Sequence, residues 1–466
     1  AAFSGIEAVS RANHQPPVSF DALLLVALLI ARVRIDTLAD LVAPRPEETI
    51  RQLPVLGRLL SDSTWALMRN WLTDPISLLM ITAAFALSAL YLFVDALRMR
   101  LPEVATYRLK LGLILAICAV TVAAQSLYLV GLRHLTGPAS FAHDGGVIQT
   151  EEAAKLFRRG LNPYREDYSN TPLADWGLEL RTAVYHYPYL PFTFLLSAPV
   201  MAMAEKVLGW YDQRLLYLAC YALMLALAPS LSGKRGEALL LTAILGLNPI
   251  MGSDVIFGMN DVLILSLLVL GLFCLRRGHP ALGSLAFALA WASKSTAWFL
   301  LPYYIAYLAG DALREGQRLR VALARFWPAL ACLAVILLPF VLWDPAAIFD
   351  DVWAWSAGTS PSSYQIRGWG LSNLVLALSL VPDKQAYFPF WIPQLIVCLP
   401  LLIGTVRRQW RDNTLQQMMF GFAVLFGAYS FLSRFCNENY FGFFLSLLAI
   451  SAFVDEPSGR RWANQD

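Results

Sequence analysis

The chain consists largely of long apolar runs, separated by short segments that hold most of its charged residues. A helix that crosses a bilayer needs about 20 mostly apolar residues. Three shorter runs, at Leu23–Ile35, Leu190–Ala204 and Leu371–Val381, fit short crossings, re-entrant segments or surface helices. We therefore expect an all-α polytopic membrane protein with roughly 10–13 transmembrane helices. The main candidates are Ile76–Leu97, Leu109–Val130, Leu215–Pro229, Ala238–Ile250, Val262–Leu275, Ala281–Tyr307, Phe326–Trp343, Phe388–Thr405, Met418–Leu432 and Tyr440–Val454.

The distribution of Lys and Arg predicts which loops share a face of the membrane. Short basic loops occur at 98–110, 234–235, 276–277, 314–325, 407–411 and 460–461. Basic loops favour the cytoplasmic side. Placing all of them there leaves Leu190–Ala204 and Leu371–Val381 on the outside and requires a break in Ala281–Tyr307 near Lys294. The long loop 132–213 then also lies outside, together with the turn 248–261, and most unusual polar residues gather on that face.

Composition narrows the class of partner. Hydrophobic residues make up 58% of the 466 residues and charged residues only 15%, whereas roughly a quarter of a soluble domain is charged. The net charge of +3 is spread over short loops. A nucleic-acid partner would require a basic stripe, so none is expected. The six cysteines form no CxxC pair, which argues against a zinc site.

Ionisable side chains near the membrane are the strongest sign of function. Burying one there costs about 2.5–3.5 kcal/mol, so such groups usually face a cavity or pair with one another. Carboxylates suit acid–base chemistry or a divalent cation such as Mg²⁺ or Mn²⁺, and single cations suit a phosphate. The spacing is no metal signature, and no metal-ligating residue is assigned. The residues concerned are Asp144, Asp254, Asp261, Lys294, Arg367, Arg434 and Glu438.

The stretch "HDGGVIQTEEAAKLFRRGLNPY" (143–164) directly follows a predicted membrane helix and reads as water-facing chain. Gly145 and Gly146 would let the backbone approach a ligand closely. Thr150 is expected to cap an amphipathic helix that lies in the membrane interface and ends at Gly160. The following "YHYPYLPF" (185–192) is expected to anchor the chain at the membrane surface through its aromatic rings.

With these motifs the chain resembles the GT-C superfamily of integral-membrane glycosyltransferases, most closely the bacterial polyprenol-phosphate-mannose-dependent mannosyltransferases. The likeness lies in the two stretches just quoted, in "NPIMGSDVIFGMNDVLILSLLVLGLFCLRRG" and in "GSLAFALAWASKSTAWFLLPYY", with a looser echo in "RFCNENYF". It covers roughly Leu109 to Pro302. It implies a GT-C-type helix bundle with a long external first loop that carries juxtamembrane helices.

The resemblance also suggests how the chain is divided. Residues 1–108 form an N-terminal extension with one or two membrane segments, which lies ahead of the usual first helix. Residues 109–310 form the GT-C-like module, with the external catalytic loop at 132–213. Residues 311–466 form a C-terminal transmembrane module.

Site residues follow by position within the family motifs. Asp144 matches the acidic residue of the first external loop, which is the catalytic base or a metal ligand in the family. Asp261 matches the acidic residue that closes the second external turn. Basic external residues lie near the donor phosphate. The substrate-binding candidates are His143, Asp254, Asn260, Asp261, Lys294, Arg367, Arg434, Asn437, Glu438 and, as secondary candidates, His186 and Tyr187.

The activity that the resemblance implies is transfer of a sugar, with mannose favoured, from a polyprenyl-phosphate-linked donor to a hydroxyl of a glycan or glycolipid acceptor. The transfer would invert the anomeric centre, with an Asp as general base, on the extracytoplasmic face of a bacterial plasma membrane. Two alternatives stay open. One is a GT-C transferase for another lipid-linked sugar, arabinose or glucose. The other is a polyprenyl-lipid transporter or flippase, although no internal repeat typical of transporters is visible.

Overall fold

The computed structural model describes residues 18–38, 45–69, 73–177, 181–314 and 319–456. This part of the chain is helical and irregular, except for two short strands, β1 (Arg367–Gly368) and β2 (Phe435–Cys436), which pair in parallel. Five helices in it are long and apolar enough to cross a membrane. There are six if α11 (Arg235–Leu247) and α12 (Pro249–Phe257), which meet at a 46° bend, form one broken span. The predicted all-α polytopic membrane protein is thus confirmed, and the predicted 10–13 crossings stay a prediction.

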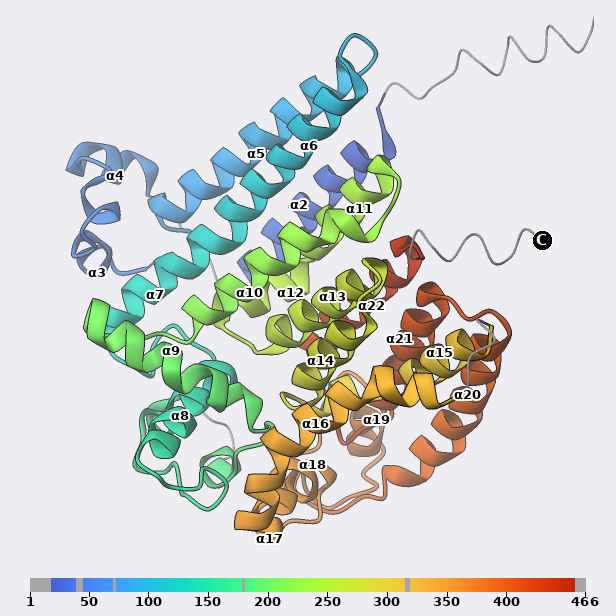
Figure 1. Ribbon diagram of the computed structural model, residues 1–466. Helices are drawn as coiled ribbons and strands as arrows, with labels where there is room; N and C mark the ends of the chain where they lie inside the picture. The colour runs from blue at the N-terminus through green and yellow to red at the C-terminus, as the bar shows by residue number, and fades with distance from the viewer. Residues whose placement is uncertain (1–17, 39–44, 70–72, 178–180, 315–318, 457–466) are drawn as a thin grey trace, which may run out of the picture.

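The first part of the chain contains the longest of the candidate membrane spans, Glu103–Thr136. Asp74 caps α5, because its carboxylate accepts the N–H groups of Ile76 (3.0 Å) and Ser77 (2.9 Å), and a proline occupies the first helical position. A π-helical turn joins α6 to α7, so that Glu103–Thr136 runs as one helix. Figure 1 shows α5 and α6 side by side, joined by a turn at one end of the molecule. The helices are α2 (Phe20–Leu38), α3 (Glu47–Arg51), α4 (Asp62–Met68), α5 (Pro75–Ala96), α6 (Glu103–Cys118) and α7 (Ala124–Thr136).

Helix α2 from the predicted N-terminal extension is part of the core. It packs against α11 (Arg235–Leu247) and α12 (Pro249–Phe257). Arg32 of α2 is fully buried and lies against Gly252 of α12, where an added Cβ would stand 1.5 Å from Arg32 Nη1. The N-terminal extension therefore helps to hold α12 in place, through the contact of Arg32 with Gly252. The three predicted domains stay predictions.

The segment after α7 folds into short helices around an aromatic core. Tyr187 is fully buried, and its ring lies 5.8 Å from that of Tyr164 and 5.6 Å from that of Phe194. The predicted aromatic anchor at the membrane surface is therefore wrong for Tyr187, because its ring fills the protein interior. The elements are η3 (Asp144–Gln149), α8 (Thr150–Arg158), η4 (Pro172–Asp175), η5 (Arg181–Tyr185) and α9 (Phe192–Leu208).

Helix α8 packs on protein along its apolar side. The Phe157 ring lies 5.6 Å from that of Phe194 in α9, and Arg158 forms a 2.7 Å ion pair with Glu205 of α9. The expectation of an apolar stripe that faces the membrane is wrong for this side of α8, because α9 covers it. Gly160, with a φ of +77°, follows the helix as predicted.

Thr150 is not the helix cap that the sequence predicted. The π-helical turn η3 runs into α8 without a break, so helical structure already begins at Asp144. His143 occupies the N-cap position, with its Nδ1 3.3 Å from the Gly146 nitrogen. Thr150 Oγ1 instead donates to the Gly145 carbonyl (2.9 Å).

The second half of the chain completes the bundle. The run predicted at Ala281–Tyr307 breaks at Lys294, which has extended backbone, as expected. In Figure 1, α8, α17 and α18 lie at the end of the molecule opposite the α5–α6 turn. The remaining elements are α10 (Arg214–Leu227), η6 (Ala228–Leu231), α13 (Asp261–Arg276), α14 (Pro280–Trp291), η7 (Ser295–Leu300), α15 (Leu301–Arg314), α16 (Leu319–Trp343), α17 (Pro345–Phe349), η8 (Asp350–Ala354), α18 (Trp355–Ala357), α19 (Leu371–Ala377), α20 (Trp391–Arg411), α21 (Leu415–Phe431) and α22 (Glu438–Phe453).

Candidate active site

One large cavity, of about 1410 Å³, brings together polar residues from distant parts of the chain. Its walls come from η3, the turn between α12 and α13, the start of η7, the loop that follows η8 and the start of α22. Most of the predicted site residues line it: His143, Asp144, Asp254, Asn260, Asp261, Lys294, Arg367, Arg434, Asn437 and Glu438. His186 and Tyr187 are not among the lining residues.

The η3 turn places Asp144 at the cavity wall. The His143 N–H donates to the Phe257 carbonyl at the end of α12 (2.9 Å), and Tyr217 Oη donates to the Gly146 carbonyl (2.6 Å). A Cβ on Gly146 would stand 2.0 Å from the Gly258 carbonyl oxygen. The expectation that Gly146 admits a ligand is therefore wrong, because the close approach is between two segments of this chain.

Asp144 is held as a carboxylate. Its Oδ1 lies 2.9 Å from His143 Nδ1 and accepts the Gly145 N–H at 2.7 Å. Burial raises the pKa of Asp144, but His143, the Gly145 N–H and the positive charge of Arg367 outweigh burial, so that this pKa lies below its ordinary value. Asp144 is thus ionised at neutral pH and able to accept a proton.

Asp261 and Lys294 neutralise each other. Lys294 Nζ donates to Asp261 Oδ1 (2.7 Å) and to Asn260 Oδ1 (3.0 Å), and Asn439 Nδ2 donates to Asp261 Oδ2 (2.6 Å). Three elements that are remote in sequence thereby meet at one ion pair. Asn439 also lines the cavity. It stands in the "NENY" stretch of the sequence, but it was not among the predicted site residues.

The two arginines of the predicted set differ in what they bind. Arg434 is 2% exposed, and its guanidinium donates to the carbonyls of Tyr364 (2.5 Å), Gln385 (2.9 Å) and Ala386 (2.9 Å). Burial lowers the pKa of Arg434 to about 10. Arg367 is exposed and forms no ion pair within the described part of the chain. Arg367 is therefore the better placed of the two to meet an anionic ligand, and Arg434 fixes the loop beside it.

His186 and Tyr187 bind a neighbouring loop. His186 Nδ1 lies 2.8 Å from Asp351 Oδ1, its Nε2 lies 2.6 Å from Ser362 Oγ, and the Tyr187 N–H donates to Asp351 Oδ2 (2.8 Å). Burial raises the pKa of Asp351 to about 6, against the opposing effect of His186. These contacts join the segment that follows α17 to the segment that precedes α9. His186 and Tyr187 therefore hold the cavity wall in position.

A divalent cation was considered for the carboxylates Asp144, Asp254 and Asp261. Among the described residues, their ligand atoms do not converge as a metal site requires, and both carboxylate oxygens of Asp261 already accept hydrogen bonds. The set that does converge is His186, Asp350 and Asp351, with ligand atoms within 4.8 Å of one another. Both ring nitrogens of His186 are already in hydrogen bonds. The possible divalent cation stays a prediction.

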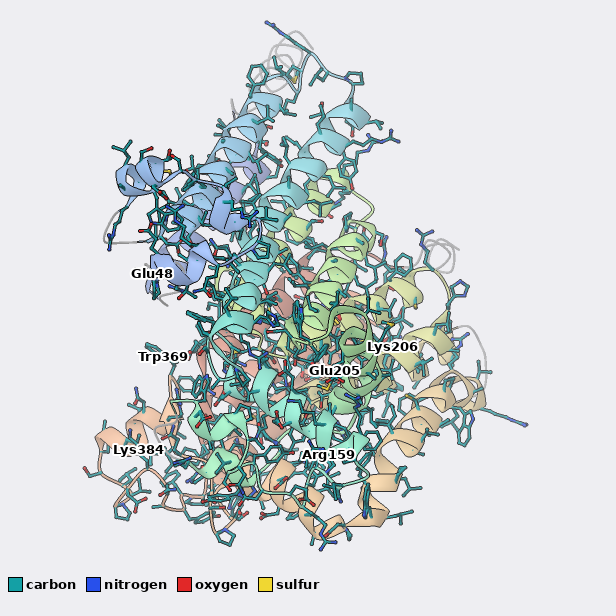
Figure 2. All side chains as sticks on the ribbon, turned by 90° about the vertical axis from the view of Figure 1, so that its left-hand side faces the viewer. Glu48, Arg159, Glu205, Lys206, Trp369 and Lys384 are labelled. Atoms are coloured by element: carbon teal, nitrogen blue, oxygen red, sulfur yellow. The ribbon has the colours of Figure 1, made fainter. Side chains whose placement is uncertain are left out.

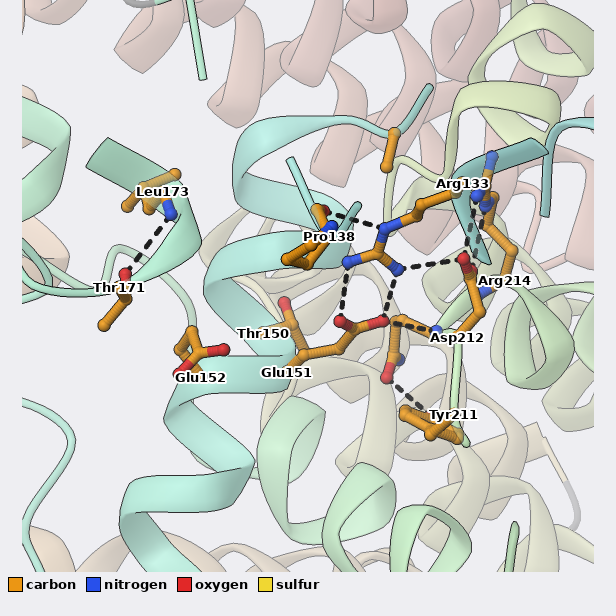
Figure 3. A network of polar contacts seen from close by, with 12 residues as sticks. Arg133, Pro138, Thr150, Glu151, Glu152, Thr171, Leu173, Tyr211, Asp212 and Arg214 are labelled. Atoms are coloured by element: carbon orange, nitrogen blue, oxygen red, sulfur yellow. Dashed lines mark hydrogen bonds and ion pairs between the residues drawn. The ribbon is translucent and has the colours of Figure 1, made fainter. Parts of the chain in front are cut away.

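A buried network of four charges, which the sequence did not reveal, supports η3 (Figure 3). Arg133 donates to Glu151 through both terminal nitrogens (2.9 and 2.8 Å) and to Asp212 (2.9 Å). Arg214 donates to Asp212 and to the Phe141 carbonyl (2.7 Å). Despite burial, Arg214 and Arg133 hold the pKa of Asp212 well below its ordinary value. The network joins α7, α8 and α10 and fixes the chain just ahead of His143.

Comparison with protein families matches residues 152–310 to the family described as alpha-(1->6)-mannopyranosyltransferase, N-terminal domain. The matched segment runs from α8 into α15; it includes Asp254, Asn260, Asp261 and Lys294 and begins after Asp144. No curated protein and no solved structure matches the chain. Through residues 152–310 the chain is similar to the alpha-(1->6)-mannopyranosyltransferases, so the predicted resemblance to mannosyltransferases is confirmed and the match supports a glycosyltransferase that acts on mannose.

Proposed function

We propose that this protein transfers mannose from a polyprenyl-phosphate-linked donor to a hydroxyl of a glycan or glycolipid, with Asp144 as the general base. The observation that carries the proposal is the side chain of Asp144, in contact with His143 and the Gly145 N–H, on the wall of a cavity that also holds the exposed Arg367. We place the reaction on the extracytoplasmic face of a bacterial plasma membrane. The distribution of basic loops along the sequence supports that side.

The cavity lining suits a lipid-linked donor. Trp353, Trp369 and Trp391 line it while remaining 41%, 66% and 58% exposed. In Figure 2, Trp369 lies at the edge of the molecule between Glu48 and Lys384. Exposed tryptophans are typical of membrane interfaces, and their rings offer apolar surface to a polyprenyl chain. Arg367 would meet the phosphate, where a fixed cation stabilises the charge that develops on the leaving group.

The proposed reaction is a direct displacement. The acceptor oxygen forms a bond to the anomeric carbon while the bond from that carbon to the phosphate oxygen breaks. The electron pair leaves with the polyprenyl phosphate, and the proton of the acceptor hydroxyl passes to Asp144. The name of the matched family specifies an alpha-(1->6) linkage. The acceptor in the proposed reaction is therefore the 6-hydroxyl of a mannose residue. Because displacement inverts the anomeric centre, an α product requires a β-linked donor.

The test uses the full chain in nanodiscs, with a short-chain polyprenyl phosphate mannose and methyl α-mannopyranoside as acceptor. We expect wild type to release polyprenyl phosphate and form a disaccharide, and Asp144→Asn to be about 10²–10⁴-fold slower, which is the usual contribution of a general base. The control is Asp175→Asn, the same change at an exposed residue beside the cavity lining. Equal rates for wild type and Asp144→Asn would remove Asp144 from the chemistry, and retained configuration would exclude direct displacement.

The alternatives are separated by the same preparation. Arabinose- and glucose-linked polyprenyl phosphates determine the sugar. In sealed vesicles a flippase moves the donor across the bilayer without cleaving it, so intact donor on the opposite leaflet identifies that activity. Assays with EDTA and with added Mg²⁺ or Mn²⁺ determine whether a divalent cation takes part.

A further inference from the structure

Several side chains at the cavity wall carry a buried polar atom that has no hydrogen-bond partner in the described part of the chain. These atoms are Asp254 Oδ2, Asn260 Nδ2, Thr296 Oγ1, Trp355 Nε1, Gln365 Oε1, Asn437 Oδ1 and Asn439 Oδ1. Buried polar atoms in folded proteins nearly always have a partner, and each exception calls for an explanation. Such a group in one cavity indicates a polar ligand. Asp254, Asn260, Asn437 and Asn439 belong to α12 or to the first residues of α13 and α22 and their caps.

Two of these side chains are held in a fixed orientation. Asn260 Oδ1 accepts from Lys294 (3.0 Å), which leaves its Nδ2 as a donor. Asn439 Nδ2 donates to Asp261 (2.6 Å), which leaves its Oδ1 as an acceptor. Together with Asp254 and Asn437, these side chains therefore offer both donors and acceptors. Asn260 and Asn439 contact the ion pair of Asp261 and Lys294.

This pattern suits hydroxyl groups better than an ion. A hydroxyl both donates and accepts, so neighbouring hydroxyls of one ring can satisfy donors and acceptors together. An anion would meet the negative charges of Asp261 and Glu438, which act on Asp254. A metal cation would meet the positive charges of Lys294 and Arg32, which act on the same carboxylate.

We propose that Asp254, Asn260, Asn437 and Asn439 form a sugar subsite, which recognises the hydroxyls of a hexopyranose bound in the cavity. The identity of that sugar as mannose rests on the proposed function, whereas the subsite itself does not. In this arrangement Asp144 and Arg367 serve the reacting bond and the phosphate, and the four residues select the sugar. A site built to pair hydroxyls discriminates strongly against analogues that lack one, because its own groups are then left unpaired.

The experiment measures binding, which requires no turnover. Wild type, Asp254→Asn and Asn437→Ala, as full chains in nanodiscs, are titrated with polyprenyl phosphate mannose, with the same polyprenyl phosphate without sugar, and with methyl α-mannopyranoside. Asp254 Oδ2 and Asn437 Oδ1 have no partner in the described chain, so these variants are expected to fold, and their melting temperatures are checked. Asp175→Asn is the matched control.

For wild type we expect the mannosyl lipid to bind more tightly than the sugar-free lipid. In Asp254→Asn the Kd for the mannosyl lipid should rise about tenfold, whereas the Kd for the sugar-free lipid should not change. Such a loss assigns the subsite to the donor sugar. A loss confined to methyl α-mannopyranoside assigns it to the acceptor sugar. Monodeoxy mannosides provide a second readout, since the penalty for the missing hydroxyl should shrink in Asp254→Asn.

Three results would overturn the subsite: folded variants that bind every sugar probe as wild type does, equal weakening of the sugar-free lipid, or a wild type that binds no sugar probe. Failure of the proposed function is distinguishable from these. A protein that binds mannosides through Asp254 but releases no polyprenyl phosphate would keep the subsite and lose the transferase.

Discussion

At the scale of single residues, the carboxylate of Asp144 depends on its sequence neighbour. Among the groups that lower the pKa of Asp144, His143 has the largest effect, followed by the Gly145 N–H and Arg367. A base whose pKa is lowered works above that pKa and is lost as the pH falls through it. The proposed transfer should therefore keep its rate well into the acid range, until Asp144 takes up a proton.

We predict that His143→Asn raises the pKa of Asp144, because it removes the imidazole, which lowers this pKa more than any other neighbouring group. The acid limb of the kcat/KM profile should then move to higher pH, with a smaller change in the rate at neutral pH. His134→Asn, a change at an exposed histidine of α7, serves as the control. A profile that superimposes on that of wild type would show that His143 does not tune the base.

Sequence reasoning at this scale located polar residues well but not their partners. It placed Asp144, Asp261 and Lys294 in one site, because charges next to apolar runs are rare and stand out. It could not tell Arg367 from Arg434, because Arg434 is bound by backbone carbonyls, which have no sequence signature. Nor could it show that the two charges of Asp261 and Lys294 cancel.

At the scale of elements, the site depends on how closely η3 approaches the turn between α12 and α13. Helical elements were predictable from apolar runs, and the break at Lys294 from the placement of the basic loops. The contact between η3 and this turn was not predictable, because two glycines after Asp144 are equally typical of a ligand-binding loop. The π-helical start of α8 was also unpredictable, since Thr150 has the ordinary features of a helix cap.

We predict that Gly146→Ala pushes η3 away from the α12–α13 turn, because the new Cβ would meet the Gly258 carbonyl, a backbone atom that cannot rotate aside. Overpacking of this kind typically costs about 1–3 kcal/mol, and the displaced Asp144 should slow the transfer as well. The control is Gly112→Ala in α6, where an added Cβ has no neighbour within 4 Å and helix propensity favours alanine. Thermal melting in detergent and the transfer assay measure the two effects, and equal melting of both variants would contradict the close approach.

At the scale of the whole molecule, buried charged side chains join helices from distant parts of the chain next to the site. The paired residues Glu151, Asp212 and Arg133 lie in three separate segments. No local sequence motif therefore predicts that they pair. The same holds for α2, whose Arg32 packs under α12 although nothing in the N-terminal sequence suggested a role. Apolar patterning predicts that helices pack, but the long-range choice of polar partners emerges only from the fold.

The network of Arg133 gives the last prediction. Arg133→Met leaves Glu151 and Asp212 buried with one cation fewer, and breaking a buried pair in this way costs about 3–5 kcal/mol. The melting temperature in detergent should therefore fall clearly, and the transfer should slow, because the chain ahead of His143 loses its support. The control is Arg158→Met, which breaks a half-exposed pair with Glu205 worth about 0.2–1 kcal/mol. If both variants melted together, the Arg133 network would contribute no more than a surface pair. The position of η3 would then be maintained by its contacts with Phe257, Tyr217 and the Gly258 carbonyl.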